Sequence, residues 1–461
     1  MTVLTPSLKS INGRVAQKGT LYPTMPPDHP LRQRLNDEVH ARPPERPTSP
    51  CRVSFLALVA DGEQRRAAWE IIRAEAARCG APPPNPASAH YSADFDGFRL
   101  KAERHTEFYR IKIIAPGYGR GGPSDGFAET ALQSARADWV ETLPGQLLCA
   151  IHAVIGLSQG WPPNFDRLGP AFPTTDGLIG AMLVGGLGAA FTDLRIREDR
   201  FSRLLIYDHG LSPGQLGRTL QRLVEMDTYR MLALLALPIA RARTGELTEI
   251  ERDLSRVTAA LVSAAEAEEP GLLERLTRLA AQVESLQAES QFRFAAAASY
   301  YDLVERRIAE LREQRIEGLQ TFGEFMERRL APAMRTCRAV VERQETLSAR
   351  ISRATDLLST RVELSSQRQS HALLESMNQR AKLQLRLQET VEGLSVAAIT
   401  YYIVSLVGKA AEGLEREGLR VDPALAMAIA IPVVAGLVAL GVWRIRRSVG
   451  KAFEVGHGKE P

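Results

Sequence analysis

The chain has 461 residues, which is enough for two or three structural units. Its 44% hydrophobic and 24% charged content is typical of a folded protein and excludes a disordered chain. The formal net charge is only +4, with 58 basic and 54 acidic residues. This balance argues against nucleic acid as a partner, because nucleic-acid-binding proteins concentrate positive charge on one face.

Residues 1–50 are rich in proline and predict loops with one short helix near residues 30–39. The first part of this segment has no apolar stretch of the length that a signal peptide needs, so we expect this end to stay in the cytoplasm. The four cysteines of the chain form no CxxC pair and have no histidines at zinc-binding spacing. Reduced thiols of a cytosolic protein are therefore expected.

Residues 51–243 carry the pattern of a cytoplasmic α+β domain. Strands are expected at residues 51–59, 91–95, 98–105, 108–115, 147–154, 178–184, 189–195 and 201–207, and helices at residues 64–78 and 213–237. The second and third strands are joined tightly at Asp96-Gly97. Consecutive strands with short turns favour a mostly antiparallel sheet with helices to one side.

Residues 244–392 predict a long helical or coiled-coil stalk. Apolar residues recur at alternating spacings of four and three in two short seams, as in coiled coils. These seam residues are Leu272, Leu276, Leu279, Val283 and Leu286, then Leu347, Ile351, Ala354 and Leu358. Two interpretations remain open: an antiparallel helical bundle within one chain, or a coiled coil through which copies of the chain form a homo-oligomer.

Residues 393–443 predict a transmembrane hairpin with spans at 393–408 and 424–443. The second span has no charged residue and is long enough to cross the ~30 Å hydrocarbon core as a helix. The first span is also uncharged but shorter, so a core or re-entrant helix competes with it. The lipid bilayer is therefore an expected partner.

Basic residues flank the outer ends of this hairpin, and the tail at residues 444–461 is basic. They are Arg380, Lys382 and Arg386 before it, and Arg444, Arg446, Arg447 and Lys451 after it. The connector between the spans also carries acidic residues. Because basic residues stay on the cytoplasmic side, we expect a multi-pass protein of the bacterial inner membrane with both termini in the cytoplasm.

The densest polar motifs are the stretch containing Glu38 and His40 and the turn containing His105 and Glu107. A histidine and a glutamate two apart on a strand face the same side, so His105 and Glu107 can reach one ligand. Adding Glu38 and His40 makes a candidate metal or acid/base site. A salt-bridged turn or an interdomain contact explains the same residues.

Four local patterns suggest chemistry, but their context favours turns. Residues 117–122 lack the GK[ST] ending of a phosphate-binding loop, and residues 185–188 lie between two expected strands. The GxSxG pattern at Ser158 is followed by Trp161-Pro162-Pro163, and that at Ser212 by Pro213, which has no N–H to serve as an oxyanion donor. We predict no catalytic residue, no cofactor-binding residue and no cofactor.

Three segments of the chain together resemble a known protein family. They are the stretch from His29 to Pro43, which contains Glu-Val-His-Ala-Arg-Pro at residues 38–43, then His105-Thr-Glu-Phe108 and Glu392-Gly-Leu-Ser395. This is an uncharacterised proteobacterial family of predicted membrane-anchored proteins, known only as a domain of unknown function. The resemblance covers nearly the whole chain. It implies location and architecture and brings no assigned activity.

The layout is also similar to that of the pentameric CorA-type magnesium channels, which place a cytoplasmic α/β domain before a stalk helix and two C-terminal spans. Those channels carry a Gly-Met-Asn triplet after the first span, where this chain reads Gly408-Lys409-Ala410. Three hypotheses follow, in order: a non-enzymatic membrane-anchored scaffold or regulatory protein, a divergent two-span ion channel or transporter, and a membrane-tethered enzyme.

Overall fold

The computed structural model describes residues 26–40, 44–86, 88–118, 125–136, 138–157, 168, 171–173, 177–416 and 422–456. The chain divides into two compact units. The first unit comprises Met1–Asp253 and Leu279–Arg350, and the second comprises Leu254–Arg278 and Ile351–Pro461. The boundary expected between residues 243 and 244 falls inside a continuous helix.

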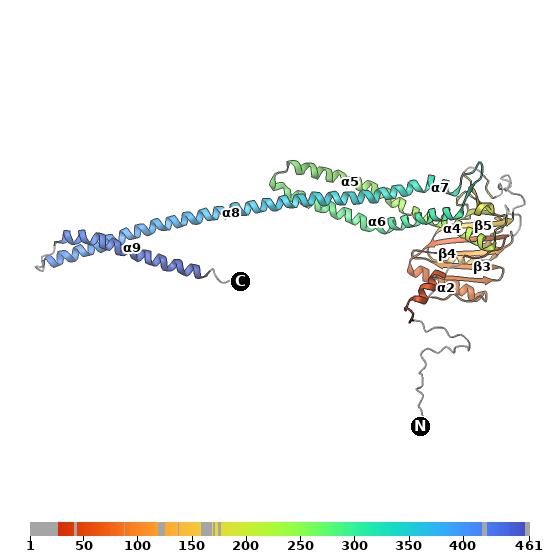
Figure 1. Ribbon diagram of the computed structural model, residues 1–461, viewed down its shortest axis with the longest axis horizontal. Helices are drawn as coiled ribbons and strands as arrows, with labels where there is room; N and C mark the ends of the chain where they lie inside the picture. Colours follow the sequence, from red (N-terminus) through yellow and green to blue (C-terminus); the bar gives the residue numbers. More distant parts are fainter. Residues whose placement is uncertain are drawn as a thin grey trace, which may run out of the picture. The chain divides into compact units, whose positions relative to one another are not determined.

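Within the described residues, the first unit contains one sheet of nine strands, in the order β2-β3-β4-β1-β5-β8-β7-β6-β9. Figure 1 labels β3, β4 and β5 of this sheet. The strands are β1 Cys51–Val59, β2 His90–Phe95, β3 Phe98–Arg104, β4 Phe108–Pro116, β5 Gln146–Leu157, β6 Ile179–Leu183, β7 Gly188–Thr192, β8 Ser202–Asp208 and β9 Gln314–Arg315. Among these strands, β5 and β8 pair in parallel and the other neighbours pair antiparallel. The α+β domain with a mostly antiparallel sheet is confirmed.

The two faces of the sheet differ in chemistry because successive side chains of a strand point to opposite sides. On β4, Tyr109, Ile111 and Ile113 belong to an apolar core that also contains Trp69 of α2 (Gly62–Arg78). Arg110 alternates with them, and it pairs with Glu225 of α4 (Pro213–Leu234) at 2.9 Å. At β3 and β4 the face toward α2 is therefore apolar, and the face toward α4 carries buried charges. Helices pack on both faces of the sheet, whereas the sequence favoured helices on one side.

Short helices complete the first unit. They are α1 Arg32–His40, α3 Ala131–Ser134 and α7 Phe322–Arg329, with 3-10 turns at Asp138–Thr142 and Val184–Gly186. The chain before β1 crosses the charged side, where the carboxylate of Glu45 accepts hydrogen bonds from Ser92 and Arg99 at 2.7 and 2.5 Å. A Cβ atom on Gly217 of α4 would lie 1.7 Å from the Glu45 carbonyl oxygen, so α4 and this segment touch through their backbones.

The predicted stalk consists of α5 (Ala236–Ser263), α6 (Glu269–Leu311) and α8 (Ala331–Arg416), with a 3-10 turn at Glu266–Glu268. In the first unit, Arg343 of α8 pairs with Glu251 of α5, and Arg243 of α5 pairs with Glu289 of α6, both at 2.5 Å. In the second unit, Arg361 of α8 pairs with Glu269 of α6 at 3.0 Å. The helices thus pack against one another within one chain, as the first interpretation of the stalk predicted.

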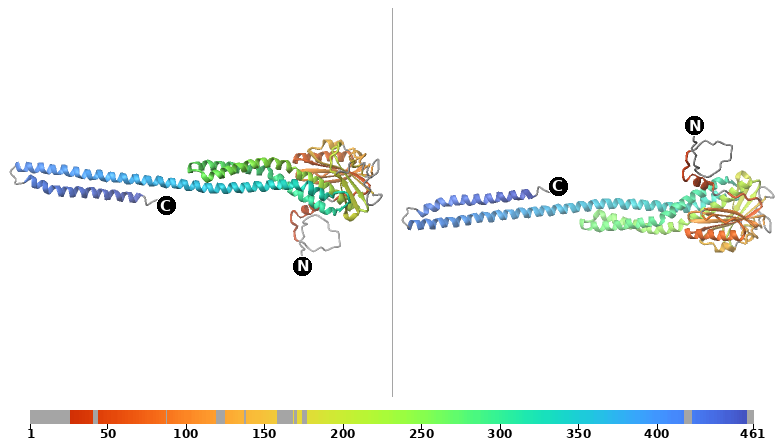
Figure 2. Two further views of the ribbon diagram at one scale, coloured as in Figure 1. Left: turned by 90° about the horizontal axis from the view of Figure 1, so that it is seen from above. Right: turned by 90° about the horizontal axis from the view of Figure 1, so that it is seen from below.

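In the second unit, α8 continues without a break through residues 393–408, and α9 (Pro423–Gly456) returns alongside it, as both views in Figure 2 show. A Cβ atom on Gly408 would lie 2.6 Å from the sulfur of Met427, so the two helices approach closely there. By length and composition, two helical stretches among the described residues are apolar enough to cross a membrane, within Phe322–Arg416 and at Pro423–Arg444.

Candidate functional site

A cavity of about 720 Å³ opens in the first unit beside the turn between β3 and β4. Its walls come from the first turns of α2, the end of β3, the β3–β4 turn, and the facing sides of α4 and α6. The lining residues are Gly62, Arg65, Arg66, Ala89, Arg104, His105, Thr106, Phe108, Tyr229, Tyr300 and Leu303. Segments far apart in the sequence therefore meet around one volume of ligand size.

Backbone hydrogen bonds hold the β3–β4 turn in place. The N–H of His105 donates to the carbonyl oxygen of Phe108 at 2.8 Å, and the two rings stack with centroids 4.3 Å apart. The N–H of Ala60 donates to the carbonyl oxygen of Glu107 at 3.0 Å. The turn is thus tied to the chain between β1 and α2, which places the start of α2 next to His105.

Glu107 binds two residues of α6 through its carboxylate. Oε1 accepts a hydrogen bond from the Tyr300 hydroxyl at 2.5 Å, and Oε2 accepts one from Arg293 at 2.7 Å. The side chain of Glu107 is only 12% exposed. Burial, followed by the bond to Glu107, raises the pKa of Tyr300, so the hydroxyl stays protonated and acts as a donor.

The predicted metal or acid/base site stays a prediction. His105 and Glu107 lie in a turn, so the rule for residues on one side of a strand does not apply to them. The side chains of Glu38 and His40 lie outside the described part of the structure. Among the described residues, no group of three or more His, Cys, Asp or Glu is placed to hold a metal ion.

Three arginines give the cavity its charge. The Arg104 guanidinium lies over the Trp69 ring, 4.5 Å from its centroid, and donates to the carbonyl oxygen of Pro86 at 2.7 Å. Burial, and then the neighbouring Arg65, lowers the pKa of Arg104. Arg66 is largely exposed and lies 4.0 Å from Glu63. Of the described residues that line the cavity, none is a carboxylate.

Two tyrosines, one on α4 and one on α6, also line the cavity. The rings of Tyr229 on α4 and Tyr300 on α6 stack with centroids 5.8 Å apart and an interplanar angle of 15°. Burial raises the pKa of Tyr229, and nearby Glu225 raises it further. The cavity thus combines cationic groups on the side of α2 and β3 with neutral aromatic rings on the side of α4 and α6.

A buried ion network lies on the charged face of the sheet. Glu225 of α4 joins Arg110 of β4 to Arg307 of α6, at 2.9 and 2.6 Å, and Arg110 also binds Glu103 of β3. Burial alone raises the pKa of Glu103, but Arg110 and Lys101 outweigh it and hold the pKa at about 2. These pairs fix α4 and α6 against the strands that carry the cavity.

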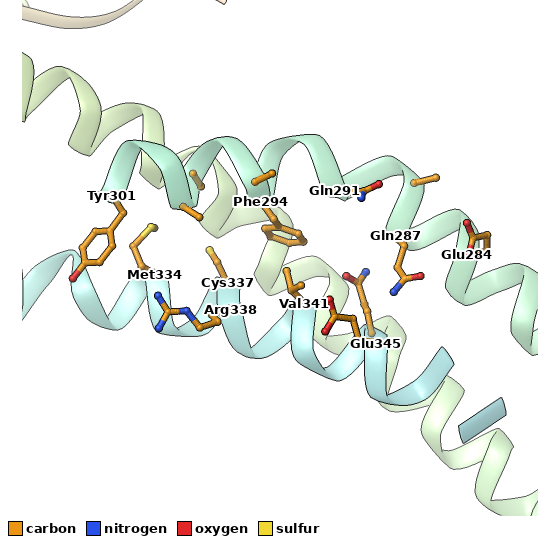
Figure 3. A pocket seen from close by; sticks show the side chains of 15 residues that line it. Glu284, Gln287, Gln291, Phe294, Tyr301, Met334, Cys337, Arg338, Val341 and Glu345 are labelled. Atoms are coloured by element: carbon orange, nitrogen blue, oxygen red, sulfur yellow. The ribbon is translucent and has the colours of Figure 1, made fainter. Parts of the chain in front are cut away.

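A second cavity, of about 500 Å³, is a groove between α6 and α8 in the first unit. Figure 3 shows Phe294 pointing from α6 toward α8, with Cys337 and Val341 on the facing helix. Burial raises the pKa of Cys337, so its thiol is neutral. The lining of this groove mixes apolar side chains with charges of both signs, Glu284, Arg338 and Glu345. We place the candidate functional site in the first cavity, whose described lining combines three arginines and aromatic rings with no carboxylate.

The serine patterns have structural explanations or lie outside the described residues. Ser212 is the N-cap of α4, where its hydroxyl accepts the N–H of Gln215, and Ser158 is not among the described residues. A different serine, Ser54, lies 2.9 Å from Nδ1 of His152, whose Nε2 is 3.9 Å from Asp199. Ser54 is fully buried, and burial lowers the pKa of His152 to about 3, so both side chains belong to the core, whereas Asp199 is exposed.

Sequence reasoning singled out His105 and Glu107 but missed the residues around them. Arg65 and Arg66 look like solvated positions on an amphipathic helix, and Tyr300 lies in the predicted stalk. No local spacing links them to residue 105. The pairing of α6 with the β3–β4 turn is visible only in the folded chain.

A protein-family model described as "Protein of unknown function (DUF3422)" matches residues 27–449. No protein with a curated description and no solved structure matches the chain. The matched range contains both the cavity and the apolar helices, so the family model covers both structural units.

Proposed function

The chain belongs to the DUF3422 family of proteins of unknown function, as its motifs predicted, and we propose that it is a membrane-anchored scaffold or regulatory protein without enzymatic activity. The proposed location is the bacterial inner membrane. The C-terminal part of α8 and α9 form the anchor as a hairpin of two spans, and the sheet of the first unit works in the cytoplasm.

The observation that carries this proposal is the exposed apolar surface of α9. Leu425 and Leu437 expose 62% and 65% of their surface, and Trp443 exposes 54%. Exposed apolar area costs about 25 cal/mol per Å² in water, and large contiguous patches of it mark interaction surfaces. Residues 423–443 of α9 carry no charged side chain, and in the described part of the structure none of this apolar stretch is buried, so it is suited to lipid.

The close approach of Gly408 to Met427 supports a hairpin, because small residues let two membrane helices pack tightly. A hairpin returns the chain to the side from which it entered. Arg444 follows the second span, and arginines precede the first, so the positive-inside rule puts both ends in the cytoplasm.

Cell fractionation tests the anchor. The full chain and a version ending at Thr390 are expressed in bacteria, and membranes are washed with sodium carbonate. We expect the full chain in the washed membrane and the shortened chain in the soluble fraction. Equal solubility of the two would refute the proposal, and a reporter at Pro461 that is active only outside the cytoplasm would refute the topology.

We further propose that copies of the chain associate through α8 in the second unit. Leu373 and Leu374 expose 65% and 60% of their surface there, and Met377 exposes 59%. The mass of the purified chain in mild detergent tests this. A dimer or larger assembly supports association, whereas a monomer rules it out. A monomer or dimer also removes the CorA-type pore, which needs a ring of copies.

A further inference from the structure

We infer that the cavity beside the β3–β4 turn binds a small phosphorylated compound through Arg65, Arg66 and Arg104. This ligand site is independent of the membrane anchor, because every residue that forms it belongs to the first unit.

The charge of the cavity favours an anionic ligand. Arg65 and Arg66 reach the cavity from α2, and Arg104 reaches it from the end of β3. None of the described lining residues is acidic, so the three guanidinium groups face one volume without a carboxylate in its wall. Glu63, which lies 4.0 Å from Arg66, is 92% exposed and does not line the cavity. Like charges gathered in this way repel one another, and an anion that enters the cavity relieves the repulsion.

The type of cation favours phosphate. A guanidinium group presents a planar set of N–H donors that matches two oxygens of a phosphate, and such charge-assisted bonds are the strongest of their kind. Arg104 is held in a fixed position by its stacking on Trp69 and its bonds to the carbonyl oxygens of Pro86 and Ser88. Arg66 has a side chain that is 70% exposed and can reorient toward a ligand.

Size and shape favour a compound larger than phosphate itself. The cavity volume of about 720 Å³ is in the range that holds drug-sized ligands. Among the lining residues, Tyr300 stacks on Tyr229, and Phe108 stacks on His105 at the turn. A flat ring of the ligand can lie against these aromatic faces while its phosphate contacts the arginines.

Isothermal titration calorimetry on the full chain in detergent tests this inference, with AMP, pyrophosphate and adenosine as probes. We expect AMP and pyrophosphate to bind and adenosine to bind at least about tenfold more weakly than AMP, since it lacks the phosphate. Absence of binding by both phosphorylated probes, or equal binding of adenosine and AMP, would overturn the inference.

Two variants locate the site. Arg66→Gln removes a cavity guanidinium that is mostly exposed, so the fold is retained, and we expect AMP binding to weaken about tenfold. Arg73→Gln is the matched control, because Arg73 lies on the same helix, pairs with Glu70 at 3.1 Å and does not line the cavity. An equal loss in both variants would show general electrostatic attraction and overturn the site.

A soluble short-chain phosphatidic acid separates two sources of the phosphate. Tighter binding of this lipid than of AMP, with the same loss in Arg66→Gln, supports the site and identifies a lipid headgroup as the source. Weaker binding than AMP supports the site and identifies a soluble metabolite. Binding of the lipid that Arg66→Gln leaves unchanged, without binding of AMP or pyrophosphate, would overturn the inference.

Discussion

The hydroxyl of Tyr300 on α6 donates a 2.5 Å hydrogen bond to the carboxylate of Glu107, 193 positions earlier in the chain. With Arg293, which binds the other carboxylate oxygen, this bond joins a helix of the predicted stalk to the turn between β3 and β4. The contact closes one side of the candidate site. It also gives a direct way to test whether α6 is docked on the sheet.

Tyr300→Phe should lower the free energy of unfolding by about 2 kcal/mol, because it removes a hydrogen bond to a charged acceptor. Glu107→Gln should cost at least as much, since it leaves the partly buried Arg293 without its carboxylate. Denaturant unfolding of the full chain in detergent measures both changes.

The two residues share one network, so the double variant should lose less than the sum of the single losses. Tyr301→Phe is the control, because the Tyr301 hydroxyl bonds to Glu305 one turn away on the same helix. A loss in Tyr301→Phe as large as that in Tyr300→Phe would contradict the role of this contact.

Two glycine substitutions should have opposite effects. Gly217→Ala should lower stability by about 2 kcal/mol or more, because its Cβ would lie 1.7 Å from the backbone carbonyl oxygen of Glu45, which cannot rotate away. Gly245→Ala, in α5, meets nothing within 4 Å and should raise stability by up to about 1 kcal/mol through helix propensity. Thermal melting of both variants provides the measurement, and a gain in Gly217→Ala would contradict the packing of this segment.

Lys112→Met should stabilise the protein at pH 7. Burial, followed by the nearby Arg110 and Lys101, lowers the pKa of Lys112 from 10.5 to about 8. Among the described residues, Lys112 has no carboxylate within ion-pair distance. The shift corresponds to about 3 kcal/mol of destabilisation by the charged form.

The effect should depend on pH in a defined direction. Below pH 8 the lysine is protonated in both the folded and the unfolded chain, so the full cost of its charge is present. Between about pH 8 and 10.5 the unfolded chain binds more protons, and the free energy of unfolding of the original protein rises with pH. The advantage of Lys112→Met should therefore shrink by about 2 kcal/mol between pH 7 and pH 9.5.

Lys101→Met is the matched control for this prediction. Lys101 is the cross-strand neighbour of Lys112, but its amine lies 3.2 Å from Glu103. Its removal takes a cation away from a buried carboxylate and should destabilise the protein at pH 7. If Lys112→Met lowers the free energy of unfolding as much as Lys101→Met does, the prediction is wrong and the buried amine of Lys112 stabilises the fold.

Gly408→Val should weaken the hairpin of α8 and α9. The added side chain would meet Met427, which is flexible, so we expect a modest cost of about 1 kcal/mol. Gly393→Val changes the helix propensity of α8 by the same amount but meets nothing within 4 Å. The aggregation temperature of the chain in detergent should fall further in Gly408→Val than in Gly393→Val. Equal falls in the two variants would argue against the close approach of α8 and α9.

Strong local patterns predicted the elements well. The apolar run of β1 begins and ends at the predicted residues 51 and 59, and the Asp96-Gly97 turn joins β2 to β3 as expected. The unpredicted strand β9 has only two residues, Gln314 and Arg315, in a stretch expected to be helical. It forms by pairing with β6, and such pairing leaves no periodicity in so short a segment.

In the stalk too, local spacing predicted the helices but not the helices they pack against. The seam containing Leu276 and Val283 indicated helix, and both residues are buried in α6. The seam did not indicate where the chain folds back, because heptad spacing is the same for a partner in the same chain and for one in another. The turn after Ser263 brings α6 back along α5 of the same chain, where Arg243 of α5 pairs with Glu289 of α6.

The sequence by itself determined most of the secondary structure, the family and the two apolar helices, because each depends on patterns that are read along the chain. Only the tertiary structure decided that Arg65, Arg104, His105 and Tyr300 line one cavity. These residues come from three separate parts of the chain. Their meeting depends on the docking of α6 through Glu107 and Glu225, and the energy of that docking comes from contacts between residues that no local spacing connects.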